Sequence, residues 1–326
     1  MASVGIVGLG SYVPPRKMTN EDWAGIVDTS DEWISSKTGM KVRRIADDDV
    51  CTSDLAFEAC SYALEDAGLH ASDVDMVILA TSSPDVPLSS TAGILQDKLG
   101  CSNCSAFDIN AVCAGWVTAL DVGSRYAGTP GYRNVLVVGS EVYSRILNWQ
   151  DRSTCVLFGD GAGAAVLSEV EEGKGILGSW LMSDGSGASV IEIPAGGVRV
   201  PLGSDAFEDG MQYFHMDGRA VWDFAIEAFP QAVRSVLKRV GRGLGDVDLI
   251  IPHQANINII EAGMRGLGLP MDKAFTNLHK YGNTAGASVP IAMREAMDEG
   301  LIGPGSLVVT TAFGGGLAWG ANAMIL

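Results

Sequence analysis

The sequence is short of positive charge. Its 22 Lys and Arg residues are outnumbered by 39 Asp and Glu residues, which gives a formal net charge of −17 at pH 7. Binding to nucleic acid requires clustered Lys and Arg side chains, so this balance argues against a nucleic-acid partner. It argues equally against binding to an anionic membrane surface, because such surfaces attract basic segments.

Long apolar runs and a dense cysteine pattern are also absent. No run is long enough to span a bilayer, and residues 1–5 lack the charged and apolar regions of a signal peptide. Six cysteines in 326 residues do not indicate a disulfide framework, so we expect a reducing, cytoplasmic environment. Cys101 and Cys104 have the spacing of a metal or redox pair, but neither a second pair nor a histidine lies nearby. We favour structural thiols and expect no metal site.

The chain has, instead, an internal repeat. A helix predicted over residues 53–68 precedes a buried strand over 73–81, and a helix over 221–240 precedes a strand over 246–251. Both strands begin with Asp-Val-Asp, at positions separated by 248 − 75 = 173 residues. Alternating helices and mostly apolar strands favour mixed or parallel sheets covered by helices, in an α/β fold.

The repeat extends to the later part of each unit. Segment 113–115 matches segment 284–286 at an offset of 284 − 113 = 171, and each unit closes on an apolar hairpin that contains several glycines. These hairpins are predicted over residues 155–167 and 308–319. We therefore expect two halves, residues 1–172 and 173–326, packed about a pseudo-twofold axis so that equivalent loops face one cleft.

Two further segments bear on the fold. Residues 183–216 are rich in glycine and polar residues, which indicates an insertion that forms a lid or a tunnel wall. The glycines of 159–163 do not follow the GxGxxG spacing and lack a strand-turn-helix context, so they do not indicate a dinucleotide site.

Three polar residues fall near the turns that the repeat brings together. Cys113 follows a strand-like segment and starts a helical pattern, where the helix dipole lowers a thiol pKa and backbone N–H groups can hold an oxyanion. His253 follows a buried strand, and Asn283 precedes a run of small residues. Each alone has a structural explanation: a core residue for Cys113, a buried histidine, and a helix N-cap for Asn283. Together they form a plausible set for acyl-thioester chemistry.

These residues and their surroundings resemble the β-ketoacyl-acyl-carrier-protein synthase III family of the thiolase superfamily. The resemblance covers essentially the whole chain, and its specific motifs are Asp-Thr-Ser-Asp-Glu-Trp-Ile at 28–34, Pro-His-Gln-Ala-Asn at 252–256 and Tyr-Gly-Asn-Thr at 281–284. The Cys-His-Asn combination separates this family from elongating synthases, which use Cys-His-His, and from thiolases, which use a second cysteine. The resemblance implies a thiolase-like five-layer αβαβα sandwich, a homodimer and no cofactor.

The resemblance also implies a two-step Claisen condensation that starts fatty acid or polyketide chains. A primer acyl-CoA acylates Cys113, a malonyl thioester on acyl carrier protein loses carbon dioxide, and the resulting carbanion attacks the acyl group. His253 and Asn283 donate hydrogen bonds to the malonyl thioester oxygen. The backbone N–H groups of Cys113 and Gly315 hold the tetrahedral oxyanion, and Phe313 shields the cysteine.

For CoA, the resemblance implies that Trp33 and Arg152 enclose the adenine ring, which both side chains can stack against. It implies that Asn256 and the backbone near Gly218 line the pantetheine tunnel. Lys37 stands where the family often has an arginine, so a phosphate there meets a point charge without the bidentate fork of a guanidinium.

Two other departures concern the substrates. Leu88 stands where the family has a large aromatic residue at the base of the primer pocket, and a smaller residue there could admit primers longer or bulkier than acetyl. The basic patch that docks acyl carrier protein is depleted, because its positions hold Asp223, Asn258 and Gly266, with Arg265 nearby. A shifted patch could use Arg219, Arg234, Lys238 and Arg239.

Three functions are compatible with these patterns. The first is an initiating condensing enzyme that uses malonyl-acyl carrier protein, which Asn283 favours. The second keeps the acyl-Cys113 intermediate but transfers the acyl group to a CoA-bound or small-molecule acceptor, which the depleted basic patch favours. The third is a non-catalytic partner protein, which the intact combination of Cys113, His253 and Asn283 disfavours.

Overall fold

The computed structural model describes residues 3–326, whose larger strands form two sheets. The first sheet has five strands in the order β1-β7-β6-β4-β5. Their bounds are β1 (Ser3–Tyr12), β4 (Met76–Ala80), β5 (Ser105–Ile109), β6 (Val135–Glu141) and β7 (Gly161–Val170). β4 pairs in parallel with β5 and β6, and β7 pairs antiparallel with β6 and β1. This sheet is mixed, as the sequence predicts.

The second sheet repeats the arrangement of the first with one strand fewer. Its order is β11-β12-β13-β8, with β11 parallel to β12 and the other pairs antiparallel. The bounds are β8 (Gly175–Ser183), β11 (Leu249–Pro252), β12 (Leu307–Gly314) and β13 (Ala318–Ile325). The counterpart of β5 is reduced to a single parallel bridge between Ile250 and Ala274.

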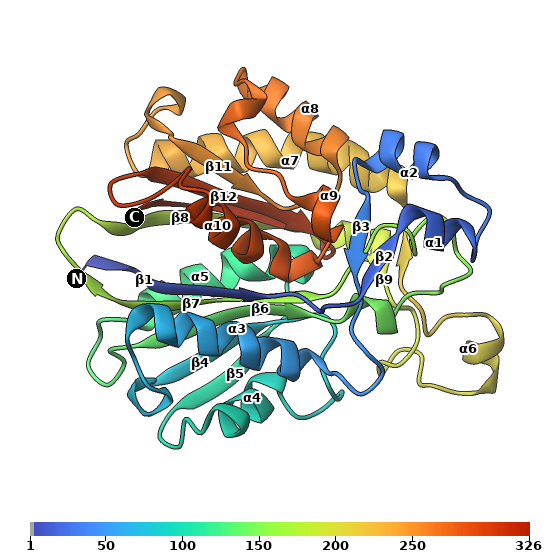
Figure 1. Cartoon of the computed structure of the whole chain (residues 1–326), viewed down its shortest axis with the longest axis horizontal. Coiled ribbons are helices and arrows are strands. Elements are labelled where there is room, and N and C mark those ends of the chain that lie inside the picture. Colours follow the sequence, from blue (N-terminus) through green and yellow to red (C-terminus); the bar gives the residue numbers. More distant parts are fainter. Residues whose placement is uncertain (1–2) are drawn as a thin grey trace.

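Helices cover both faces of each sheet, which gives five layers (Figure 1). The outer helices are α3 (Thr52–Ala67) and α4 (Thr91–Leu99) on the first sheet, and α7 (Gly218–Arg239) and α8 (Ile257–Leu267) on the second. Between the sheets lie α5 (Gly115–Tyr126) and α10 (Ser288–Asp298). Strands β4 and β6 are buried along their whole length because helices cover both of their faces, and this explains their nearly continuous apolar sequences. The thiolase-like layered fold is confirmed.

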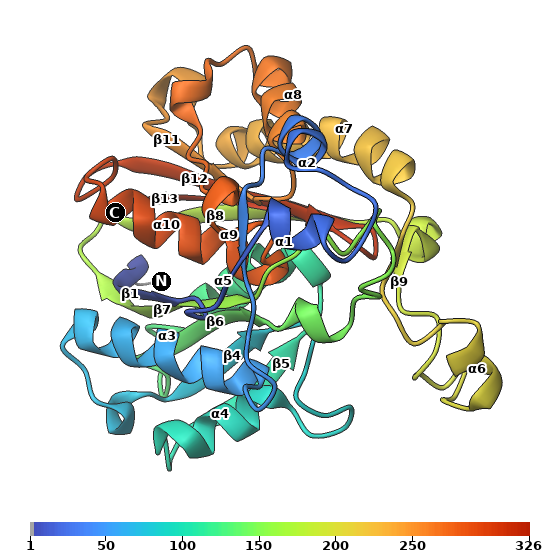
Figure 2. The same ribbon diagram turned by 45° about the vertical axis from the view of Figure 1, so that its right-hand side comes forward.

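Smaller elements surround this sandwich. They are β2 (Lys17–Thr19), α1 (Asn20–Ala24), α2 (Asp31–Thr38), β3 (Val42–Arg44), β9 (Ile191–Glu192), α6 (Ser204–Glu208), β10 (His215–Met216) and α9 (Leu278–Tyr281), with short 3-10 turns at 71–73, 112–114, 143–145, 185–190, 244–246, 271–273 and 285–287. Figure 2 shows α6 on an arm that leaves the body of the molecule. Across residues 3–326, no helix combines the length and apolar character needed to cross a membrane.

The predicted elements of the repeat are present, with one correction. The helices and strands expected over 53–68, 73–81, 221–240 and 246–251 appear as α3, β4, α7 and β11. The hairpin expected over 308–319 is formed by β12 and β13. The hairpin expected over 155–167 is wrong, because β7 pairs with β6, and residues 142–160 form the long connection between them.

The repeat has an offset of 173 at the paired central strands and at the turns before α5 and α10, and of 274 − 106 = 168 at the counterpart of β5. Met76 is the register partner of Val135 in the first sheet, and Leu249 is the partner of Val308 in the second, with 249 − 76 = 173 and 308 − 135 = 173. The 3-10 turns before α5 and α10, at 112–114 and 285–287, follow the same offset. The predicted alignment of segments 113–115 and 284–286 was therefore shifted by two residues.

Candidate active site

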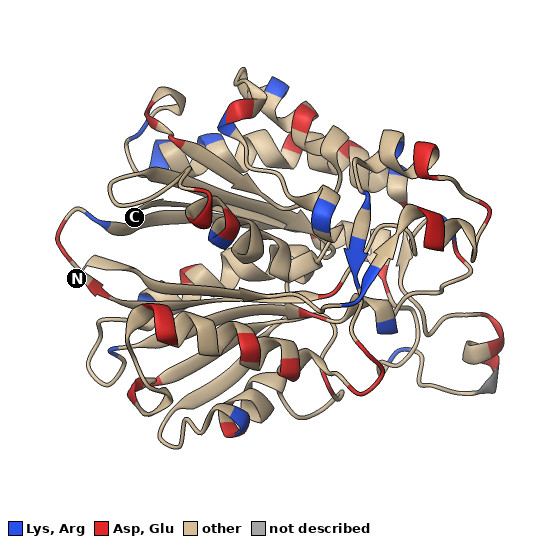
Figure 3. Cartoon of the chain, in the orientation of Figure 1, with Lys and Arg blue, Asp and Glu red and all other residues tan. Residues whose placement is uncertain are grey.

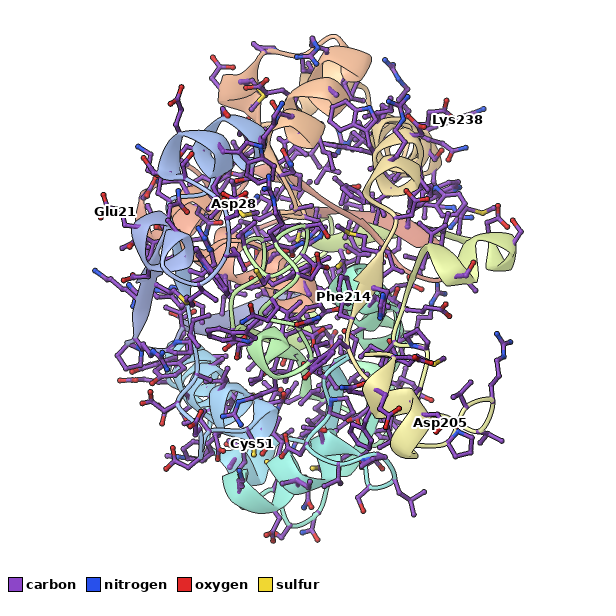
Figure 4. The ribbon with its side chains drawn as sticks, turned by 90° about the vertical axis from the view of Figure 1, so that its right-hand side faces the viewer. Glu21, Asp28, Cys51, Asp205, Phe214 and Lys238 are labelled. Carbon is purple, nitrogen blue, oxygen red and sulfur yellow. The ribbon has the colours of Figure 1, made fainter. Side chains whose placement is uncertain are left out.

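A tunnel between the two halves brings the three predicted polar residues together. Cys113, His253 and Asn283 all line it and are all buried. Much of the remaining wall is apolar and aromatic, including Leu157, Phe158, Ile191, Phe214, Phe224 and Ile259. Figure 4 looks at the side of the molecule where Phe214 lies near the centre, between the elements of the two halves. The tunnel therefore places a thiol, an imidazole and an amide in an apolar setting.

Cys113 lies on a strained turn. The 3-10 turn η2 (Val112–Ala114) precedes α5, and Val112 has φ = 47°, in the left-handed region that a β-branched residue rarely adopts. Gly314, at the end of β12, packs against this turn, and a Cβ atom there would lie 2.8 Å from the Cys113 backbone nitrogen. A residue larger than glycine at position 314 would displace the cysteine.

The surroundings of Cys113 favour its protonated thiol. Burial, and to a lesser extent the carboxylate of Glu141, raises the pKa of Cys113 far above its ordinary value, and a bond to the backbone N–H of Cys113 offsets only part of this. The expectation that the helix dipole lowers this pKa is therefore wrong. The physical reason is that the apolar wall removes the water that would solvate a thiolate.

His253 is anchored at the end of β11. Its backbone N–H donates to the carbonyl of Thr311 at 2.8 Å, and its ring atom Nδ1 lies 2.7 Å from Oγ of Ser288. The ring of Phe313 meets the imidazole edge-on, with 5.4 Å between the centroids. Burial lowers the pKa of His253 to about 3, so the imidazole is neutral at physiological pH. A neutral imidazole can donate a hydrogen bond without bringing a charge into the tunnel.

Asn283 uses one end of its amide to hold its own turn. The side-chain Oδ1 accepts a hydrogen bond of 2.8 Å from the backbone N–H of Ala285, a residue with φ = 44°. The backbone of Asn283 is also fixed, because its N–H donates to Leu157 and its carbonyl accepts from Gly159. The Nδ2 group is therefore the part of the side chain left to donate to a ligand in the tunnel.

The mouth of the tunnel carries the predicted aromatic-cation pair. Arg152 lies over the ring of Trp33, with 5.1 Å from Cζ to the ring centroid, and one guanidinium nitrogen is 3.4 Å from Asp28. Trp33 and Lys37 line the tunnel, both from α2. Because the guanidinium rests on the indole, an adenine ring could enter between them only after Arg152 moves away.

Comparison with known proteins agrees with this geometry. Residues 107–185 match the family model described as 3-oxoacyl-[acyl-carrier-protein (ACP)] synthase III, and residues 237–325 match the model of its C-terminal part. The chain is 50% identical over 320 residues to a beta-ketoacyl-[acyl-carrier-protein] synthase III of Caldanaerobacter subterraneus subsp. tengcongensis, covering 98% of this chain and 97% of that protein.

The chain belongs to the β-ketoacyl-acyl-carrier-protein synthase III family.

Solved structures show the same similarity. The crystal structure of 3-oxoacyl-[acyl-carrier-protein] synthase III from Aquifex aeolicus VF5 superimposes with a TM-score of 0.91 at 40% identity, covering 99% of this chain and 100% of that one. A priming β-ketosynthase from the R1128 polyketide biosynthetic pathway also gives a TM-score of 0.91, at 31% identity over 100% of this chain and 96% of that one. The fold of this synthase III chain is therefore shared by two kinds of condensing enzyme.

Two residues of the predicted pantetheine tunnel also line the observed one. Asn256 caps α8, and its amide donates to the Lys37 carbonyl at 2.9 Å while its Oδ1 accepts from the Asn258 backbone N–H at 2.9 Å. It therefore ties α8 to α2 at the tunnel wall. Gly218 begins α7 and lines the tunnel, and a side chain there would meet open space. Their contacts with CoA stay predictions.

Three predicted site residues of this synthase III chain do not line the tunnel: Gly315, Leu88 and Arg152, of which Arg152 reaches it only through its contact with Trp33. At the oxyanion position, the glycine against the Cys113 turn is Gly314, whereas a Cβ at Gly315 would meet Ile191. The predicted role of the Gly315 N–H stays a prediction. Leu88 is 97% exposed and lies outside the tunnel wall, so a single chain does not bring it to the tunnel, and its predicted place in a primer pocket stays a prediction.

A second cavity adjoins the tunnel beside Cys113. Val112, Ile191 and Phe214 line both spaces. The second cavity is also lined by Ser82, Asn110, Tyr143, Ile146, Glu192 and Ile193. Residues 183–216 were expected to form a lid or a tunnel wall. They supply four residues of the second cavity: Ile191, Glu192, Ile193 and Phe214. That expectation is confirmed for the wall.

A buried carboxylate that no sequence motif marks lies beside the site. Glu141, the last residue of β6, accepts hydrogen bonds from the backbone N–H groups of Ser82 and Ser83 and from the hydroxyls of Thr81, Ser82 and Ser83. Burial nevertheless raises the pKa of Glu141 to about 7. An acidic residue that ends an otherwise apolar strand was the available signal. Glu141 organises the start of the segment that leads to Leu88.

Cys101 and Cys104 are not part of a larger group of metal-binding side chains in the described part of the chain. Cys101 is buried and Cys104 is half-buried, and burial raises the pKa of Cys101 to about 12. Within residues 3–326, no three His, Cys, Asp or Glu side chains come together as metal ligands.

Proposed function

We propose that this chain is an initiating condensing enzyme, which joins a primer acyl group from CoA to a malonyl thioester and releases carbon dioxide. One observation carries the proposal: Cys113, His253 and Asn283 line a single apolar tunnel, and an aromatic residue and two cations lie at its mouth. A thiol can carry an acyl group, and two neutral donors can stabilise an enolate without protonating it.

The first step is acylation of Cys113. Its sulfur attacks the thioester carbonyl of acyl-CoA, the bond from that carbon to the CoA sulfur breaks, and the cysteine proton leaves with CoA as its thiol. The Cys113 backbone N–H, on the strained turn, and the N–H of Gly315 donate to the oxygen of the tetrahedral intermediate. Gly314 allows β12 to approach the turn closely enough for this.

The second step is decarboxylation and condensation. The malonyl carboxylate leaves as carbon dioxide, and the electron pair passes into an enolate whose oxygen accepts hydrogen bonds from His253 Nε2 and Asn283 Nδ2. The enolate carbon attacks the acyl carbonyl and expels the Cys113 thiolate. The apolar ring of Phe313 beside His253 disfavours a charged carboxylate and so favours its loss.

The primer chain occupies the second cavity in this proposal. That cavity begins beside Cys113 and continues between Tyr143, Ile146 and Ile193, which suits an aliphatic chain longer than acetyl. Leu88 can reach such a cavity only in a second copy of the chain, because it is exposed in its own. A homodimer with this loop at its interface accounts for a leucine that is 97% exposed.

The identity of the malonyl carrier depends on charge. Figure 3 shows acidic residues distributed over the outer helices of both halves, with basic residues mostly scattered among them. Near the mouth, Arg219 pairs with Asp223 at 2.9 Å and Arg265 lies 3.8 Å from Glu261. Acyl carrier protein stays our first candidate because of the family. The paired cations favour a second candidate, in which malonyl-CoA or another small acceptor replaces the carrier.

The experiment that tests the proposal separates the two steps. Purified protein is mixed with radiolabelled acyl-CoA primers and then with malonyl-acyl carrier protein or malonyl-CoA, and 3-oxoacyl products are separated. Product from malonyl-CoA alone would reject the carrier as acceptor. Intact-protein mass spectrometry must show an acyl adduct that disappears in Cys113→Ser; an adduct that persists there would remove Cys113 as the nucleophile. The free thiols of all six cysteines support assay under the reducing conditions of the cytoplasm, our proposed location.

A further inference from the structure

The ring of His253 is held by one serine. Within residues 3–326, its hydrogen-bond partner is Oγ of Ser288, which lies 2.7 Å from Nδ1. Both side chains are buried, each with 1% of its surface exposed. Ser288 is the first residue of α10, and the His253 backbone is bonded to Thr311 on β12, so both groups are fixed by the fold. The contact is thus an anchored bond between two elements.

The direction of this hydrogen bond follows from the other contact of Ser288. The backbone N–H of Gln254 already donates to the serine oxygen, at 3.4 Å. In the described part of the chain, the serine hydroxyl proton has no other acceptor than Nδ1 of His253. If Nδ1 carried the proton instead, a buried hydroxyl would be left without an acceptor, which is costly. The serine is therefore the donor and Nδ1 the acceptor.

The other half of the molecule provides an internal comparison. At the offset of 173, His253 corresponds to Ala80 and Ser288 to Gly115. These two residues also touch, and a Cβ atom on Gly115 would lie 3.0 Å from that of Ala80. The contact between strand end and helix start is thus kept in both halves. A hydroxyl is present only in the half that has the histidine.

We propose that Ser288 is a positioning residue, whose hydroxyl holds the neutral ring of His253 as the tautomer with its proton on Nε2. With Nδ1 occupied, Nε2–H is left to donate to the thioester oxygen in the tunnel, and the ring cannot act as a base through that atom. The consequence for decarboxylation rests on the proposed function, whereas the tautomer itself does not.

The tautomer can be measured without any reaction. The full-length protein is labelled with ¹⁵N-histidine, and the spectrum distinguishes a protonated from an unprotonated ring nitrogen at each site. The chain has four histidines, so the His253 signals are assigned by their loss in His253→Ala. We expect a single tautomer with the proton on Nε2 in the wild type and a mixture in Ser288→Ala. A wild-type proton on Nδ1, or an unchanged tautomer in Ser288→Ala, would overturn the proposal.

Kinetics then test what the tautomer does. In Ser288→Ala, we expect the turnover number for malonyl decarboxylation to fall about tenfold, the cost of a weakened hydrogen bond at the enolate. Acylation of Cys113 should stay within about twofold, because that step does not use the His253 donor. Ser288→Thr keeps the hydroxyl and should restore decarboxylation to within about threefold of the wild type.

The matched control is Ser140→Ala. Ser140 is also fully buried, and its hydroxyl donates to the carbonyl of Thr52 at 2.8 Å, away from His253. We expect this variant to change neither the ¹⁵N signals of His253 nor the ratio of the two rates. If Ser288→Ala and Ser140→Ala each slowed acylation and decarboxylation by the same factor, Ser288 would have only a general packing role, and the proposal would be contradicted. If no variant, the wild type included, decarboxylates malonyl thioesters, the proposed function fails, and the ¹⁵N result still decides the role of Ser288.

Discussion

The two halves of the molecule contain the same turn, at 112–114 and 285–287, and the two turns lie against each other but are used differently. In the N-terminal half the turn carries Cys113, and the strand end packed against it is Gly314 of the other half. In the C-terminal half the equivalent position is Gly286, and a Cβ there would lie 3.1 Å from Oε1 of Glu141, the counterpart of Gly314. The backbone is thus repeated, but the residue types are exchanged. In the first pair the turn has the side chain and the strand end has the glycine, and in the second pair the turn has the glycine and the strand end has the side chain.

This difference shows what makes a turn reactive. Both turns have a residue with positive φ, Val112 in one and Ala285 in the other, and both are held by an asparagine Oδ1 that accepts the N–H of that residue. Strain and turn geometry are therefore common to the two halves. The two segments differ in the side chain that each places in the tunnel wall, which is Cys113 in the first half and Asn283 in the second. Four changes to the molecule test this comparison.

Removing a donor from one asparagine should give the largest effect. Asn283→Asp keeps the oxygen that accepts from Ala285 but loses Nδ2–H, so we expect condensation to fall about 10²- to 10³-fold with Cys113 acylation retained. The counterpart variant Asn110→Asp keeps its own turn bond; because Asn110 lines the second cavity, acylation by long primers should slow, but malonyl decarboxylation should stay within about threefold. Both rates are measured with radiolabelled substrates. Equal losses in the two variants would show that the turns, rather than the amide, limit the reaction.

Adding a methyl group at Gly314, which packs against the first turn, or at Gly286, which lies within the second, should give the next largest effect. In Gly314→Ala, the new Cβ falls 2.8 Å from the Cys113 backbone nitrogen, so the nucleophile must shift, and we expect acylation to slow about 100-fold. Gly286→Ala meets a carboxylate instead of the nucleophile turn, so acylation should suffer less. Mass spectrometry of acylation against time gives both rates. A slower Gly286→Ala than Gly314→Ala would invert the comparison.

The buried carboxylate should make stability depend on pH. Burial raises the pKa of Glu141 from 4.5 to about 7, so the folded protein binds this proton more tightly than the unfolded chain does. The contribution of Glu141 to the free energy of unfolding is therefore complete below pH 4.5 and is lost as the pH rises to 7, by about 3 kcal/mol.

Glu141→Gln removes that contribution, whatever it does to absolute stability. Urea denaturation of wild type and variant at several pH values between 4.5 and 7.5 gives the difference between their free energies of unfolding, which should change by about 3 kcal/mol across the range. A difference that stays constant with pH would mean that Glu141 is ionised at all of these values.

A substitution at the mouth of the tunnel should give the smallest effect on the reaction. Arg152→Ala removes the cation that rests on Trp33, and we expect the KM for acyl-CoA to rise about two- to fivefold with kcat unchanged. Arg125→Ala is the matched control, because Arg125 is an exposed arginine paired with Asp121 on α5. A fall in KM on removing Arg152 would indicate that its stacking on Trp33 obstructs CoA more than its cation attracts it.

The sequence was sufficient for the fold and for the residues that meet in the tunnel. The recurring Asp-Val-Asp motif gave the offset of 173, and family motifs identified Cys113, His253 and Asn283, which the structure brings together. The local alignment around Cys113 failed by two residues because it matched small residues by type. Positive φ at Val112 and Ala285, which settles that alignment, has no signature in residue type.

Other features depend on three-dimensional surroundings that a pattern does not contain. The pKa of Cys113 is governed by burial, which the position of a helix start does not report. The residues 155–167 contain enough glycine and apolar residues for a hairpin. However, β7 pairs with β6, from which it is separated by the long connection 142–160. The exposure of Leu88 depends on the path of a loop, and the bond from Ser288 to His253 joins residues 35 positions apart.

The carboxylate of Glu141 also bears on how such an enzyme can arise by duplication. A symmetric duplicate has two equivalent turns and therefore two equivalent positions for a nucleophile, here Cys113 and Gly286. With Glu141 against Gly286, a Cβ at position 286 would lie 3.1 Å from the carboxylate oxygen, so a thiol placed there would crowd a carboxylate. Cys113 comes from one half, and His253 and Asn283 come from the other, so neither half alone supplies all three residues of the tunnel.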